Sequence, residues 1–356
     1  MDEARDIVLI SFPFAAGVAL AQFCPLSFFH FALAAVAALL LLTLGGALHG
    51  RVWFGILFFA AGVLCGSTGS PVPGTTSDPV GPDIFRRALA RTGSLICGIP
   101  FPHSETNLLL RALLTGLRDG LSRETAASFR AAGASHILAL SGLHLGIIYL
   151  LLSKLLALMG NGRVAYALRS ILIVAACGFY AMMTGAGPSI VRALLFICIN
   201  ELLRHSPGRQ KSPVAVWCIA LLVQLVISPW VIRSVGFQLS YLAMLGIFTL
   251  FPWLEGFYEK PARKLSPMRW IWSSMALSIS CQAFTAPLVW LRFGTFPKYF
   301  LLTNLLALPL TSLLMFSAVA CLLLSSAGLC PGWLIWTTDS LAEILQGCLS
   351  IIASLN

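Results

Sequence analysis

Long stretches without a charged side chain constrain the fold of this sequence more than any other feature. Eight stretches contain no Lys, Arg, Asp or Glu: 7–48, 52–77, 131–153, 170–191, 212–232, 234–254, 270–291 and 299–338. A helix needs about 20 apolar residues to cross the ~30 Å hydrocarbon core of a bilayer, and the first and last stretches are each long enough for two helices. About ten spans therefore fit. With 58% apolar residues and a mean hydropathy of +0.89, a soluble globular enzyme is excluded.

The predicted fold class is an all-α polytopic membrane protein with about 10–11 transmembrane helices, an outer amphipathic helix and broken helices. The expected spans are 7–24, 29–48, 52–69, 136–158, 165–184, 189–204, 212–228, 236–253, 270–290, 299–325 and 332–355. The last of these carries Asp339 and Glu343, so it either crosses the membrane as a weak span or lies at the interface.

The distribution of Lys and Arg predicts the topology. Connections after the even-numbered spans hold basic clusters, such as those in 204–211 and 260–269, and the intervening connections hold fewer basic residues. The positive-inside rule then places the N-terminus in the cytoplasm and residues 70–135 outside. Most of the net charge of +10 is a topology signal rather than a nucleic-acid surface. The first span follows acidic residues and lacks a basic leader, which indicates that it is retained.

The sequence contains few signals for metal, cofactor or nucleotide chemistry. Its ten cysteines lie almost entirely within apolar stretches and form no C-x-x-C pair, which predicts neither a zinc site nor a disulfide framework. No phosphate-binding loop of the G-x-x-x-x-G-K-[ST] form occurs, so nucleotide hydrolysis would belong to a partner. We expect no cofactor, no metal site and no catalytic residue.

Three parts are expected along the chain. Residues 1–70 hold three N-terminal transmembrane helices, residues 71–135 an extracytoplasmic linker with interfacial amphipathic helices, and residues 136–356 the transmembrane channel core. In the middle part leucines recur at helical spacing: Leu109, Leu110, Leu113, Leu114, Leu117 and Leu121. This pattern predicts a helix that lies along the outer face of the membrane. Ser122 is expected to cap a second short helix that stops at Gly133.

The strongest local signal is the segment "GASHILALSGLHLG", where His136, Ser141 and His144 are polar within an apolar span. On a helix, Ser141 and His144 would share a face, and Gly142 would allow a neighbouring helix to approach. Three interpretations stay open. The residues form a nucleophile with its base, a polar lining for a substrate path, or buried groups that bond to neighbouring helices.

A second signal is the segment "TGAGPSIVRALLF", where glycines and Pro188 are expected to break a helix and Ser189 to cap the next one. Arg192 follows one turn later. An intramembrane arginine is costly unless it is paired or hydrated, so it indicates function by default. Beside a helix N-terminus it would attract an anionic substrate. The alternative is a structural pairing of Arg192 with backbone carbonyls or with Glu201, a possible charge partner on another helix.

Two further segments place polar groups in spans. Gln238 and Ser240 stand at the head of one span, where an amide is common as a bond between helices. Asn304 lies in a later span, and Pro309 five residues on frees a backbone carbonyl. A kinked helix with a nearby amide is frequent in transporters and is equally an ordinary packing device.

In this order, the segments resemble the bacterial competence DNA-uptake channel family, ComEC, over residues 107–320. The matched positions are Gly133, His136, Ser141, Gly142, His144, Ser189, Arg192, Ala193, Pro229, Gly236, Phe237, Gln238, Leu239, Ser240, Asn304 and Pro309. The resemblance implies an inner-membrane channel for single-stranded DNA during natural transformation, with these polar residues as candidates for the translocation path.

The resemblance also implies partners. Full-length members carry an oligonucleotide-binding barrel where this chain has only residues 70–84, and many end in a metallo-β-lactamase-like domain. We therefore expect a separate DNA-binding receptor, a nuclease, and a cytoplasmic motor or single-strand binding proteins, besides membrane lipid. The alternatives are a transporter of another anionic envelope substrate, an intramembrane hydrolase that uses Ser141 and His144, and a remnant without transport function.

Overall fold

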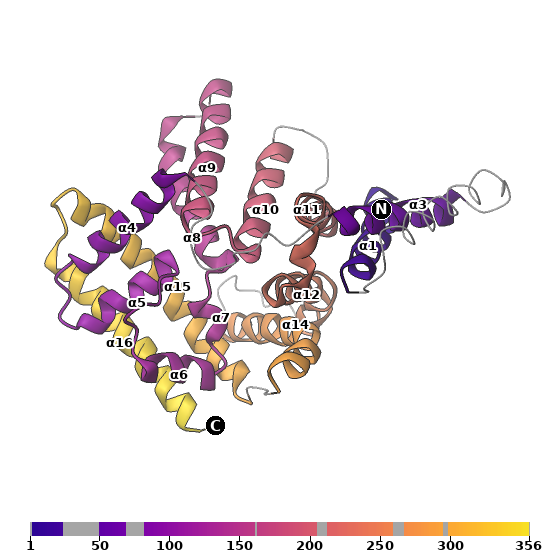
Figure 1. Cartoon of the computed structure of the whole chain (residues 1–356). Helices are drawn as coiled ribbons and strands as arrows, with labels where there is room; N and C mark the ends of the chain where they lie inside the picture. Colours follow the sequence, from indigo (N-terminus) through magenta and orange to yellow (C-terminus); the bar gives the residue numbers. More distant parts are fainter. Residues whose placement is uncertain are drawn as a thin grey trace. The chain divides into compact units, whose positions relative to one another are not determined.

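The computed structural model of the chain describes residues 2–23, 50–68, 82–160, 162–204, 212–258, 267–294 and 298–355. Every regular element among these residues is a helix (Figure 1). In this described part of the chain, five helices are long and apolar enough to cross a membrane, and three shorter helices are apolar as well. The predicted all-α polytopic membrane fold is therefore confirmed. The predicted span 29–48 lies outside the described residues.

The chain forms two compact units, Met1–Thr76 with Leu195–Phe248, and Ser77–Leu194 with Thr249–Asn356. The first unit contains α1 (Asp2–Phe23), α3 (Gly50–Thr68), α11 (Pro213–Ile227), the 3₁₀ helix η2 (Pro229–Arg233) and α12 (Val235–Thr249). The second contains α4 (Asp83–Cys97), α5 (Ser104–Thr115), α6 (Arg123–Ala131), α7 (Ser135–Leu138), α8 (Gly142–Leu156), the 3₁₀ helix η1 (Ala157–Met159), α9 (Arg163–Met183), α13 (Phe251–Glu255), α14 (Pro267–Phe293), α15 (Phe300–Ser326) and α16 (Gly332–Ser354). α10 (Pro188–Arg204) begins in the second unit and ends in the first.

In the first unit, α1 and α3 pack with their backbones in close contact, because both helices carry glycines where they meet. A Cβ on Gly17 would collide with the carbonyl oxygen of Phe59, and a Cβ on Gly62 would collide with that of Phe14. Small residues at such crossings are typical of membrane helices, since close packing between helices replaces the hydrophobic drive that water supplies.

A buried aromatic cluster completes the first unit. The rings of Trp217 on α11 and Tyr241 on α12 meet edge to face at 5.7 Å, and Phe237 lies 4.6 Å from Tyr241. The Tyr241 hydroxyl donates to Gln224 Oε1 over 2.9 Å, so the polar tip of this buried ring is satisfied. These contacts fix α12 against α11.

The second unit is built around α5, α15 and α16. Leu109, Leu110 and Leu113 of α5 are no more than 1% exposed and share a core with Leu314 of α15 and Leu345 of α16. The amphipathic helix that the leucine pattern predicts is thus present, and its apolar face packs on protein. Its position along the outer face of the membrane stays a prediction. α4, which the sequence did not predict, also packs against α5.

The amphipathic helix is also shorter than predicted. α5 ends at Thr115 because Gly116 adopts a φ of 79°, the left-handed conformation in which helices commonly stop. Leu117 and Leu121 therefore lie beyond the helix.

The predicted boundaries of the next helix are confirmed. The Ser122 side chain accepts a hydrogen bond from the amide of Thr125 and caps α6. Gly133, with a φ of 76°, ends the turn that follows α6. The Ala132 carbonyl in that turn accepts a buried 2.8 Å hydrogen bond from Thr303 Oγ1, which anchors the start of α15.

Candidate functional site

The segment "SHILALSGLHLG" forms two helices rather than one. The sequence predicts a single span over 136–158, which would set His136 about 80° from His144 around one axis. Instead α7 ends at Leu138 and α8 begins at Gly142, with the intervening backbone extended. The single-span prediction is wrong at this point, because side chains at the head of α8 cap a new helix.

Ser141 and His144 cap the start of α8 with reciprocal hydrogen bonds. The backbone amide of Leu143 donates to Ser141 Oγ over 3.2 Å, and the amide of Ser141 donates to His144 Nδ1 over 3.1 Å. A backbone N–H only donates, so Nδ1 carries the lone pair and the proton of the neutral ring is on Nε2. His144 is 1% exposed, and its Nε2 has no hydrogen-bond partner among the described residues. The helix start thus holds a buried donor that the described part of the chain leaves unsatisfied.

Arg192 of α10 lies beside this helix start. A Cβ placed on Gly142 would be 3.2 Å from Arg192 Nη2 and 3.4 Å from the Cβ of Ala193, so glycine at this position permits the contact. The unpaired amides at a helix N-terminus carry a partial positive charge. The partly buried guanidinium of Arg192 adds a full positive charge at the same place. Together they make this helix start suited to attract an anion.

The predicted break before α10 is confirmed. Gly185 and Ala186 have positive φ values of 86° and 49°, and α10 begins at Pro188. Ser189 is therefore the second residue of α10 and not its cap, a correction to the prediction. Proline suits the first helical position because its missing N–H would have no partner there. The break sets the direction of α10 and thereby the position of Arg192.

Two other path candidates of the second unit, His136 and Asn304, lie on other helices. His136 is exposed on α7, with Nδ1 3.2 Å from the Gly133 carbonyl oxygen. Asn304 is partly buried on α15, which runs from Phe300 to Ser326 as one helix with Pro309 inside it.

Gln238 and Ser240 belong to the first unit. Gln238 Nε2 donates to the Ile232 carbonyl oxygen over 2.7 Å, a bond that ties η2 to the first turn of α12. Ser240 is partly buried in the same helix. A path shared by these two residues and those of the second unit remains a prediction. Glu201, the candidate charge partner, is buried and pairs with Arg204 Nη1 over 3.2 Å, one turn along α10.

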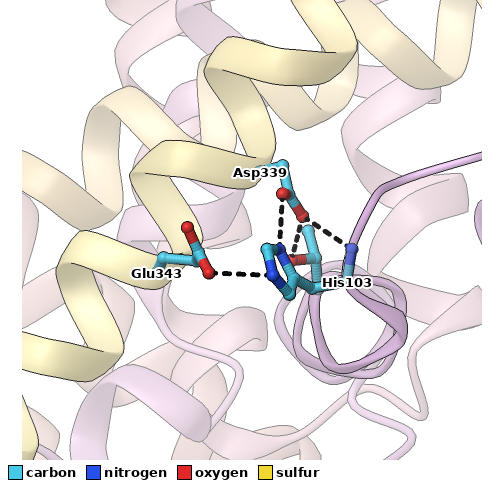
Figure 2. Close-up of polar contacts among 4 residues, drawn as sticks. His103, Asp339 and Glu343 are labelled. Atoms are coloured by element: carbon cyan, nitrogen blue, oxygen red, sulfur yellow. Dashed lines mark hydrogen bonds and ion pairs between the residues drawn. The ribbon is translucent and has the colours of Figure 1, made fainter.

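A second polar cluster joins the loop before α5 to α16 (Figure 2). His103 Nδ1 lies 2.8 Å from Asp339 Oδ2, and His103 Nε2 lies 3.1 Å from Glu343 Oε1. The hydrogen bond with Asp339 and the charge of Glu343 raise the pKa of His103. The i, i+4 spacing of the two acids was readable as one helix face. His103 precedes Asp339 by 236 positions, and no sequence signal linked them.

Most of these residues lie in a part of the chain that matches one protein-family model. The family model described as competence protein matches residues 113–356. The path candidates and α16 fall within it, and His103 lies before it. No solved structure matches the chain.

Three curated relatives are similar to parts of the chain. ComE operon protein 3 of Bacillus subtilis is 32% identical over 133 residues, which cover 37% of this chain and 17% of that protein. The uncharacterized protein YcaI of Escherichia coli is 28% identical over 221 residues, 60% of this chain and 28% of that protein. Recombination protein 2 of Haemophilus influenzae is 26% identical over 259 residues, 68% of this chain and 31% of that protein. The chain therefore spans less than a third of the length of each relative.

Proposed function

The chain belongs to the competence protein family, and from this membership we propose that it is a bacterial inner-membrane channel for single-stranded DNA in natural transformation. The observation that carries the proposal is the position of Arg192 against the N-terminus of α8, inside the region that the family model matches. Two relatives are named ComE operon protein 3 and Recombination protein 2, and the second name agrees with a role in handling DNA.

The physical case rests on what a polyanion needs inside a membrane. Phosphates that leave water must be met by fixed donors, and permanent strong binding would stop conduction. The start of α8 carries the partial positive charge of a helix N-terminus, and the His144 Nε2–H in its first turn is a buried donor. Arg192 supplies one positive charge rather than a ring of them, which attracts a phosphate without making a trap.

The proposal assigns the driving force to other proteins. In this scheme the N-terminus is cytoplasmic, and DNA reaches the outer face through a separate receptor and is degraded to one strand by a separate nuclease. A cytoplasmic motor or single-strand binding proteins draw the strand inward. The remaining candidates, His136, Ser189, Gln238, Ser240, Asn304 and Pro309, line or brace the path.

Reconstitution tests this function without its partners. Purified protein in liposomes that enclose a single-strand nuclease is mixed with quenched, fluorescent single-stranded DNA, and entry is measured as dequenching. We expect Arg192→Gln to lower the entry rate about tenfold, the factor that ~1.4 kcal/mol represents. The matched control is Arg292→Gln, since Arg292 is exposed in the last turn of α14.

Two results would contradict the proposal: no DNA entry above empty liposomes, or equal entry for the protein and Arg192→Gln at equal incorporation. Entry of a small anion such as glycerol phosphate without entry of DNA would favour the alternative, a transporter of another anionic envelope substrate.

One observation favours a hydrolase as a second candidate. Ser141 Oγ lies 3.1 Å from His144 Nδ1, within reach for a serine to pass its proton to a base. Against it, Ser141 Oγ already accepts the Leu143 amide, and the same Nδ1 accepts the Ser141 amide. Both groups are thus committed to capping α8. Labelling of Ser141 by a fluorophosphonate probe would reverse this ranking.

A further inference from the structure

The surface of α16 presents two carboxylates one turn apart, and a histidine from another element sits between them. Asp339 is 4% exposed at its side chain, whereas Glu343 and His103 are 54% and 55% exposed. Thr106 Oγ1 donates to Asp339 Oδ1 over 2.6 Å, and the His103 amide lies 3.4 Å from the same oxygen. Figure 2 shows the imidazole held edge-on, with one nitrogen toward each acid.

This arrangement requires a positive charge at the imidazole, either as a second ring proton or as a bound metal ion. A neutral imidazole has one N–H and one nitrogen lone pair, and a lone pair is repelled by a carboxylate oxygen. Both ring nitrogens of His103 nevertheless face carboxylate oxygens at hydrogen-bonding distance. One of the two contacts must therefore hold either a second proton or a metal ion.

We propose that His103, Asp339 and Glu343 form a binding site for a divalent first-row transition-metal ion such as Zn²⁺. One ligand atom from each residue lies within 4.8 Å of the others. Zn²⁺ binds imidazole nitrogen and carboxylate oxygen at about 2.0–2.2 Å, which puts tetrahedral ligand atoms about 3.3 Å apart. The two short contacts use different ring nitrogens, and one ion binds only one of them. Rotation of the side chains must therefore bring the three ligand atoms, which lie within 4.8 Å of one another, to that spacing.

The surroundings of Asp339 support a preformed site. A buried carboxylate in an apolar helix is costly unless it is bonded, and Asp339 is fixed by Thr106 and the His103 loop. The exposed sides of His103 and Glu343 leave room for water in the remaining coordination positions. The ion would link the start of α5 to α16. His103 precedes the region that the competence family model matches, so the complete ligand set is not a feature of that region.

Zinc titration tests the site directly. Untagged protein in detergent is stripped with a chelator, and Zn²⁺ binding is followed by calorimetry at about pH 7.5, where histidine competes well as a ligand. We expect one ion per chain, with His103→Ala and Glu343→Gln each weakening the affinity at least about tenfold. The controls His136→Ala and Glu124→Gln change an exposed histidine and an exposed acid elsewhere in the same unit and should bind as the unchanged protein does.

The proposal is overturned if no saturable binding occurs, or if His103→Ala and Glu343→Gln bind Zn²⁺ as tightly as the unchanged protein. Either result would identify His103 as an imidazolium that bridges the acids without a metal. If His103→Ala does not fold, Glu343→Gln decides alone, because it changes a half-exposed side chain. DNA entry in liposomes prepared with chelator is a separate readout, so failure of this site and failure of the channel proposal are distinguishable.

Discussion

His144 and His103 lie in the same unit, and each contacts an oxygen or amide through Nδ1, but their surroundings give them opposite characters. His144 is buried at the head of α8, where Nδ1 accepts a backbone amide and the ring is neutral. His103 is half-exposed, and both of its nitrogens face carboxylates, which favours a cation. The comparison teaches that burial and the groups facing an imidazole together decide whether it serves as a fixed donor or as a charge-dependent link.

The packing beside His144 gives the prediction with the largest effect. Gly142→Leu must displace Arg192 and Ala193, because even a Cβ would be 3.2 Å and 3.4 Å from their atoms. We expect unfolding to become easier by ~1–3 kcal/mol and DNA entry to be lost. Gly146→Leu is the matched control on α8, since a Cβ there meets nothing within 4 Å. Thermal unfolding in detergent measures both variants; equal midpoints would show that α8 and α10 do not meet at this glycine.

The cap on α8 gives an intermediate effect. Ser141→Ala removes the acceptor of the Leu143 amide, and loss of a helix cap typically lowers stability by ~1 kcal/mol. We expect DNA entry to persist at a reduced rate, because the His144 ring and Arg192 remain. Complete loss of DNA entry with an unchanged thermal midpoint would indicate that Ser141 acts on the substrate. Ser141 would then have a chemical role rather than the structural role of a helix cap.

The pH dependence of His103 gives the smallest effect and the clearest contrast with His144. Asp339 and Glu343 on α16 raise the pKa of His103 in the folded chain. Its stabilising contribution is therefore complete below the unfolded value of about 6.5 and is lost as the pH rises through the folded pKa. With chelator present, we expect the thermal midpoint to fall as the pH rises above about 6.5, and to fall less in His103→Ala.

Added Zn²⁺ should reverse that trend. A metal ion competes with the proton for the imidazole, so stabilisation by Zn²⁺ should grow as the pH rises. A pH profile that is identical in the unchanged protein and in His103→Ala would show that the contacts with α16 do not control the charge of His103.

The sequence predicted the elements better than their contacts. Apolar stretches located the membrane helices to within a few residues, because transfer into a bilayer depends on summed composition rather than on partners. Local chemistry also fixed the Ser122 cap, the turn at Gly133 and the break before Pro188. Each of these depends on residues within one or two turns.

The predictions that were wrong or missing have a common physical origin. The apolar pattern continues from His136 to His144, so hydropathy could not reveal that one helix ends at Leu138 and another begins after the Ser141 cap. Leucine spacing showed that α5 has an apolar face but not whether protein or lipid covers it. The pairing of His103 with Asp339 depends on tertiary packing between distant segments, which one sequence does not encode in any short-range signal.

The glycine contact between α1 and α3 has a consequence for biogenesis. Gly17 and Gly62 are close in the sequence, so the two helices can associate as soon as α3 leaves the translocon, before α11 and α12 are synthesised. Among the described helices, we expect this pair to form the earliest tertiary contact of the nascent chain, against which Trp217 and Tyr241 pack later. Cysteine crosslinking in stalled ribosome–nascent chain complexes would show at which chain length α1 and α3 come into contact. Gly62→Leu should delay this contact until after α12 emerges.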